Sequence, residues 1–144
     1  MQPKATYDDA RLILKLYEAR REDRMRKARA WFVASFKPKT LAELKVLCPT
    51  GSDENASYRM VATYWEMVAS FVTSGVLNKE LFFESGRELL LVWERIRDVV
   101  PAIREEYKDP RYYGNLEDVA ADYIEYLKRR GPDTYKAFSA RIRG

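Results

Sequence analysis

The chain has 144 residues, of which 47% are hydrophobic and 33% are charged, and its formal net charge is +4. This length suits one domain with one hydrophobic core, and the composition excludes a disordered or fibrous chain. The sequence has no histidine and a single cysteine, which excludes an intrachain disulfide, and no stretch has the pattern of a signal peptide. We therefore predict a single cytoplasmic domain over residues 1–144.

A long basic helix is predicted near the N-terminus. Thr6 can act as its N-cap, Pro38 must end it, and no Gly or Pro interrupts the residues between them. The pattern predicts one unbroken helix to about Lys37. Its predicted inward stripe consists of Ala10, Leu14, Tyr17, Met25, Ala28, Phe32 and Phe36, with Ile13, Leu16 and Trp31 beside it.

Positive charge is concentrated in the middle of this helix. Residues 1–52 contain 12 Lys/Arg against 6 Asp/Glu, whereas residues 53–144 contain 14 against 16. The predicted interaction surface consists of Arg20, Arg21, Arg24, Arg26, Lys27 and Arg29. We expect Arg20, Arg24 and Lys27 to point outward, either as a contact surface or as a merely solvated face.

Cap and turn signals delimit the next two helices. Thr40 and Glu43 have the capping-box spacing, which predicts the start of a short helix. After a loop, a longer helix is predicted from near Asp53 to Ser74, and Gly75 suits its left-handed C-terminal cap.

Residues 60–77 require a test as a membrane span, because Glu66 is their one charged residue. On a helical wheel the apolar side chains fall on one side and the polar ones on the other, which favours an amphipathic core helix. No transmembrane segment is therefore predicted. A desolvated Glu66 could act as a general acid or base, but its wheel position predicts that it faces solvent.

Residues 79–107 have helical spacing, and Asn78 can cap this element. Gly86 weakens a helix and Pro101 removes a backbone hydrogen bond, so we expect a bent or broken helix. The facing helices should share one core: Val61, Tyr64, Trp65, Val68, Phe71, Leu89, Val92, Trp93 and Ile96.

The last two predicted helices run from Asn115, as N-cap, to about Arg130 and over residues 133–142. No alternating run long enough for a strand occurs. The predicted fold is therefore an all-α helical bundle of four long helices, the fourth bent or broken near Gly86 and Pro101, plus two short helices.

The lack of histidine removes Ser-His-Asp and Cys-His catalysis and His-ligated zinc, and no phosphate-binding loop motif is present. Glu84 and Glu88 have the spacing of a hard-metal pair, although exposed pairs of this kind are commoner. Cys48 is expected to be a small buried group. We predict no catalytic residue, no metal and no cofactor; whether the chain is an enzyme stays open, with the balance against.

A charged row follows in the fourth predicted helix, and it could form either an anion pocket or an ion-pair network. Its spacing favours the network. The residues are Glu94, Arg95, Arg97, Asp98, Arg104 and Glu105.

The same region carries a resemblance. Trp93-Glu94-Arg95, Arg104-Glu105 and the Asp109-Pro110 turn are similar to an uncharacterised family of bacterial helical domains, over residues 75–127. The resemblance implies a helical fold and a bacterial source, and it supplies no activity or catalytic residue. Many members carry an N-terminal membrane segment, which this sequence lacks, so the resemblance does not support a membrane-side role.

The leading hypothesis is a non-enzymatic protein-interaction or regulatory module that presents its basic helix to a protein partner or to a second copy. One alternative is nucleic-acid binding through Arg20 to Arg29 with little sequence preference. A small-ligand-binding or enzymatic bundle that uses buried carboxylates is another. Peripheral membrane attachment is the least favoured.

Overall fold

A computed structural model describes residues 3–144, and every regular element within them is a helix, which confirms the all-α class. In chain order the helices are α1 (Tyr7–Arg21), α2 (Asp23–Ser35), α3 (Leu41–Leu47), α4 (Asp53–Thr73), α5 (Lys79–Phe83), α6 (Arg87–Ile96), α7 (Val100–Tyr107), α8 (Gly114–Arg130) and α9 (Thr134–Arg143). Of the four predicted long helices, those at α4 and α8 are continuous and the other two are divided.

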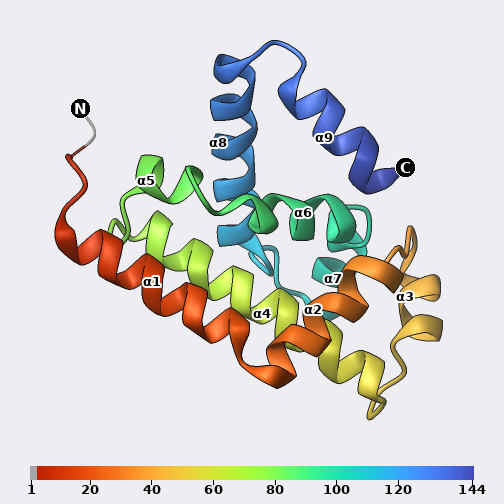
Figure 1. Cartoon of the computed structure of the whole chain (residues 1–144). Coiled ribbons are helices and arrows are strands. Elements are labelled where there is room, and N and C mark those ends of the chain that lie inside the picture. Colours follow the sequence, from red (N-terminus) through yellow and green to blue (C-terminus); the bar gives the residue numbers. More distant parts are fainter. Residues whose placement is uncertain (1–2) are drawn as a thin grey trace.

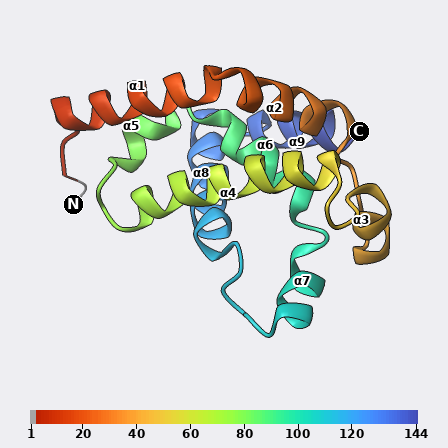
Figure 2. The ribbon, with the colours of Figure 1, turned by 90° about the horizontal axis from the view of Figure 1, so that it is seen from below.

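Helix α4 is the centre of the arrangement. α1 and α2 form a bent rod along it, while α8 meets α4 at a steep angle and carries α6 and α9 (Figure 1). Figure 2 shows α7 and the loop into α8 on the side away from this rod. No helix within residues 3–144 is long and apolar enough to span a membrane.

The prediction of one unbroken helix from Thr6 to Lys37 is wrong, because the chain breaks at Glu22. Glu22 adopts an extended conformation (φ −60°, ψ 143°), and its carboxylate accepts a hydrogen bond of 3.1 Å from Met25 N, which caps α2. The favourable helix propensities of Arg, Glu and Met do not prevent this break.

The packing reason lies in two apolar stripes with different phases. Met25, Ala28 and Phe32 are buried in α2, whereas α1 packs Leu12, Ile13 and Leu16 inward. At about 100° per residue, a straight helix would place these stripes roughly two-fifths of a turn apart. The break therefore lets both halves face the body. The α1 stripe predicted from sequence is wrong, since Leu14 and Tyr17 are 62% and 49% exposed.

The predicted break within residues 79–107 is confirmed. Gly86 is the N-cap of α6, and Pro101 lies in the first turn of α7, where its missing N–H has no intrahelical partner to lose. A Cβ at Gly86 would lie 2.3 Å from the Phe82 ring. The turn between α5 and α6 therefore requires glycine for close packing.

The buried side chains form one cluster drawn from α2 through α9. Of the predicted core, Val61, Trp65, Val68, Leu89, Val92 and Ile96 are buried. The remaining three, Tyr64, Phe71 and Trp93, are partly buried and pack against it. The prediction of a fully shared core is therefore confirmed for six of the nine residues.

Candidate functional site

An apolar cavity of about 330 Å³ lies beneath α1, between α4 and the turn that joins α5 to α6. We call it the α1 cavity. Ligand pockets usually begin near about 300 Å³ and combine apolar walls with few polar groups. One charged residue, Arg20, lies in the lining, which consists of Ile13, Leu14, Leu16, Tyr17, Arg20, Tyr64, Trp65, Val68, Phe82, Ser85 and Gly86.

Glu88 anchors a charged cluster beside the α1 cavity. Arg29 donates two hydrogen bonds of 2.8 Å to the Glu88 carboxylate, and Trp65 Nε1 donates one of 3.1 Å. The hydrogen bonds to Glu88 raise the pKa of Arg29. An Arg20 guanidinium nitrogen is 3.9 Å from Glu88 Oε2, beyond hydrogen-bond distance, and the guanidinium lies 5.3 Å from the ring centres of Tyr17 and Trp65. The cluster holds two cations and one anion.

The six basic residues that were predicted to form one interaction surface do not all point outward, because two of them belong to this cluster. The prediction that Arg20 points outward is wrong, because its side chain is 16% exposed and lies over Trp65; Arg29 is also directed inward, to Glu88. The break at Glu22 produces this division by turning the end of α1 toward the body. The other four basic side chains are exposed and form no ion pair within residues 3–144: Arg21, Arg24, Arg26 and Lys27.

Helix α1 is held at both ends, and its one buried residue is Asp9, which is 8% exposed. Asp9 accepts hydrogen bonds of 2.7 Å from Thr6 N and 2.8 Å from Asn78 N. These backbone hydrogen bonds, that of Thr6 first, lower the pKa of Asp9. At the other end, the Tyr64 hydroxyl donates to the Leu16 carbonyl. These polar contacts therefore hold the roof of the α1 cavity in addition to the packing of Leu12, Ile13 and Leu16.

We expect Asp9→Asn to loosen α1 while the remaining helices stay folded, because an amide nitrogen would face a backbone N–H. Since the pKa of Asp9 is lowered, the stabilisation is complete above the ordinary aspartate value of about 4 and is lost as pH falls through the folded-state value. Hydrogen exchange should show α1 amides about tenfold less protected in the variant at pH 6. Asp8→Asn, at an exposed neighbour, should match wild type. Equal protection in Asp9→Asn and wild type would contradict this role.

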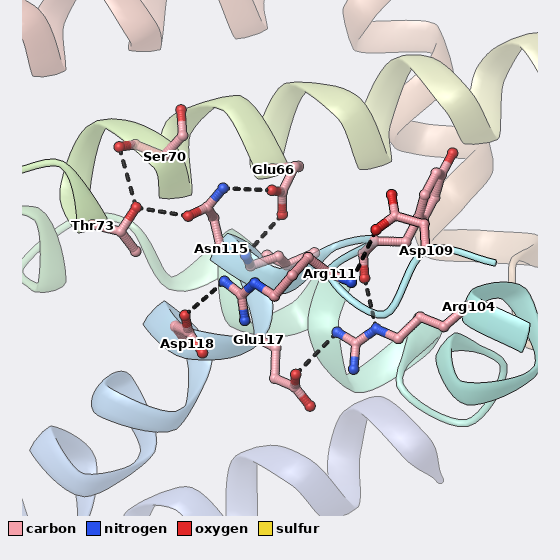
Figure 3. Close-up of polar contacts among 11 residues, drawn as sticks. Glu66, Ser70, Thr73, Arg104, Asp109, Arg111, Asn115, Glu117 and Asp118 are labelled. Atoms are coloured by element: carbon pink, nitrogen blue, oxygen red, sulfur yellow. Dashed lines mark hydrogen bonds and ion pairs between the residues drawn. The ribbon is translucent and has the colours of Figure 1, made fainter. Parts of the chain in front are cut away.

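A second polar cluster joins α4 to the start of α8 (Figure 3). Glu66 accepts hydrogen bonds of 2.8 Å from Asn115 Nδ2 and from Leu116 N, and Thr73 Oγ1 donates to Asn115 Oδ1 at 2.8 Å. Glu66 thus places negative charge at the positive end of α8. The predictions that Glu66 faces solvent and that Asn115 caps α8 are wrong, because the two side chains bind each other.

The loop between α7 and α8 is fixed by similar contacts. Arg104 donates to the Tyr112 carbonyl at 2.8 Å and to Glu117 at 3.0 Å (Figure 3). Tyr113 has a left-handed conformation (φ 59°), and its buried hydroxyl lies 2.8 Å from that of Tyr58. Burial raises the pKa of Tyr58 to about 12. The polar groups of this region form hydrogen bonds with one another. They therefore serve to connect the helices and leave none of these groups free for a ligand.

The predicted Glu84–Glu88 pair does not form a metal site. Glu84 follows the end of α5 and accepts from the Tyr126 hydroxyl at 3.0 Å, while Glu88 lies in α6 against Arg29. The break at Gly86 separates them. Within residues 3–144 no group of three or more metal-ligating side chains is found.

The charged row from 94 to 105 forms the predicted network only in part. Arg97 Nε lies 3.6 Å from Glu94, but Arg95 binds backbone carbonyls and Arg104 binds Glu117. The prediction is wrong for these two arginines, because the break before α7 and the packing of α9 direct them elsewhere. Cys48 is buried as expected, and burial raises its pKa to about 11.

Sequence reasoning missed the buried carboxylate of Glu94, which is 1% exposed. It accepts hydrogen bonds from the Tyr135 hydroxyl at 3.0 Å and the Ser139 hydroxyl at 2.5 Å, both from α9. A signal was present, because Glu94 lies four residues after buried Leu90 and so shares its helix face.

Comparison with known proteins confirms that the chain contains an uncharacterised domain, and the match covers more of the sequence than residues 75–127. A model of a domain of unknown function, DUF4760, matches residues 5–123, which include α1 through most of α8. No curated protein and no solved structure gives a significant match. Because this match covers more than half of the chain, the protein belongs to the DUF4760 family.

Proposed function

We propose that this chain is a protein-interaction module whose bend between α1 and α2 presents Arg21, Arg24, Arg26 and Lys27 to an acidic protein surface. The observation that supports the proposal is the exposure of these four cations without an ion-pair partner in residues 3–144. Buried Met25, Ala28 and Phe32 fix the inward side of α2. The four cations therefore stay exposed, and none of them replaces an apolar side chain in the core.

A protein partner fits this surface better than a nucleic acid. Exposed acidic residues, Glu18, Glu22 and Asp23, lie among the cations. A phosphate backbone is negative along its whole length and would be repelled by them, whereas a protein surface can place a cation or a polar group opposite each one. The exposed Leu14 and Tyr17 lie one to two turns away on α1 and offer apolar contact area. Protein interfaces combine arginine and aromatic side chains in this way.

The test is a charge reversal that leaves the fold intact. Arg24→Glu, Arg26→Glu and Lys27→Glu together should reduce copurification of a protein partner from the native host by at least about 100-fold, because like charges would oppose an acidic surface. The thermal midpoint should change by less than about 2 °C, because all three side chains are exposed.

A matched control reverses three exposed cations at the end of α8, Lys128, Arg129 and Arg130, and changes the net charge equally. This control should retain the partner. Equal retention by both triple variants would contradict the proposal. Binding of a 20-base-pair DNA that depends on Arg24, Arg26 and Lys27 and weakens steeply with salt would instead establish the nucleic-acid alternative.

A further inference from the structure

The α1 cavity has apolar walls that come from helices with different roles. Val68 and Trp65 belong to the central helix α4 and are buried, whereas Ile13 and Leu16 belong to α1 and are only partly buried. Phe82 of α5 closes the inner end and is 4% exposed. The floor is therefore rigid core, and the roof is a helix attached at its two ends.

Two arginines, Arg20 and Arg29, share the single carboxylate of Glu88 at one end of the cavity. Arg29 already makes both of its short hydrogen bonds to Glu88, whose Oε2 also accepts from Trp65. Arg20 remains 3.9 Å from that carboxylate, with a side chain 16% exposed, and donates no hydrogen bond within residues 3–144. A half-dehydrated guanidinium beside an apolar wall favours an anion.

The size of the cavity restricts the ligand. A volume of about 330 Å³ lies at the lower end of the roughly 300–1,000 Å³ found for ligand pockets, which suits a small ligand. Exposed residues, Leu14, Tyr17 and Ser85, lie at its rim and leave an entrance. A single alkyl chain of medium length fits this volume and composition.

We propose that the α1 cavity binds a free medium-chain fatty acid, with its alkyl chain between α1 and α4 and its carboxylate on the Arg20 guanidinium. This site is separate from the outward cations of the proposed function. Either proposal can fail without the other, because Arg20 is absent from the surface tested above.

Calorimetric titration of the full chain with decanoate, below its micelle concentration, should give one site per chain. From hexanoate to decanoate the affinity should rise about fourfold for each added methylene, because each is transferred from water to apolar walls. Decanol should bind at least about tenfold more weakly than decanoate, since it cannot form the charged contact. The methyl NMR signals of Ile13, Leu16 and Val68 should shift on binding.

Arg20→Met retains an apolar stem but removes the charge, so it should abolish the preference for decanoate over decanol. Arg11→Met, at an exposed position of the same helix that lines neither site, is the matched control and should bind as wild type does. Ser85→Trp places a large ring at the exposed rim and should block decanoate, and it tests the site even if Arg20→Met fails to fold. Absence of saturable decanoate binding, or unchanged binding in Ser85→Trp, would overturn the proposal.

Discussion

Replacing Glu94 by alanine is expected to lower the free energy of unfolding by about 3 kcal/mol. The carboxylate is 1% exposed and accepts from the hydroxyls of Tyr135 and Ser139. Without it, both hydroxyls lose a charged acceptor inside the protein, and the desolvation cost that the carboxylate no longer bears offsets only part of this loss. For a chain of this size the thermal midpoint should fall by about 10 °C.

Denaturant unfolding measures this loss, and hydrogen exchange locates it. Protection should fall most in α9, because Tyr135 and Ser139 attach that helix to α6. Glu84→Ala is the matched control: its exposed carboxylate accepts one hydrogen bond, so the change should cost under about 0.5 kcal/mol. If Glu94→Ala and Glu84→Ala proved equally stable, the buried hydrogen bonds would contribute nothing net.

Arg95→Met is expected to cost about 2–3 kcal/mol, because the guanidinium connects α2 and α9 through their carbonyls. It donates to the carbonyls of Val33 at 2.9 Å, Phe36 at 3.1 Å and Ile142 at 3.0 Å. Burial lowers the pKa of Arg95, and the charge stabilises the negative end of the α2 dipole. Methionine keeps most of the stem volume, so the loss reports the hydrogen bonds.

Urea melts of Arg95→Met and Arg95→Lys separate charge from geometry. Lysine keeps the charge at the end of α2 but cannot reach the carbonyls of two helices at once, so we expect an intermediate loss. Arg129→Met, at an exposed position of α8, should be nearly neutral. If lysine were fully equivalent to arginine, the planar guanidinium would not be required.

The local signals in the sequence predicted many helix ends correctly. Asn78 caps α5 through its own side chain, and Gly75 adopts the left-handed conformation (φ 83°) that was expected after α4. These features depend on a few adjacent residues. Glycine and proline disturb the interior of any helix. The division of residues 79–107 could therefore be predicted from Gly86 and Pro101.

The features that the sequence did not predict depend on tertiary packing. Nothing local disfavours a helix at Glu22; the break follows from two apolar stripes that differ in phase and must both face the body of the domain. The inward direction of Arg20 is a consequence of that break. The interaction surface predicted from sequence therefore wrongly included Arg20 and Arg29, which point toward Glu88. The α1 cavity could not be predicted at all, since it depends on how closely α1 approaches α4.

Helix α1 is attached by one buried carboxylate and by apolar side chains that are only partly buried, which has a consequence for divergence among related sequences. Substitutions at partly buried Ile13 and Leu16 change the shape beneath the helix, while the core that spans α2 to α9 keeps its packing. Residues that shape the cavity roof are therefore under weaker stability constraint than the floor residues Trp65 and Val68. Related chains can alter ligand size through the roof without first acquiring a stabilising change elsewhere.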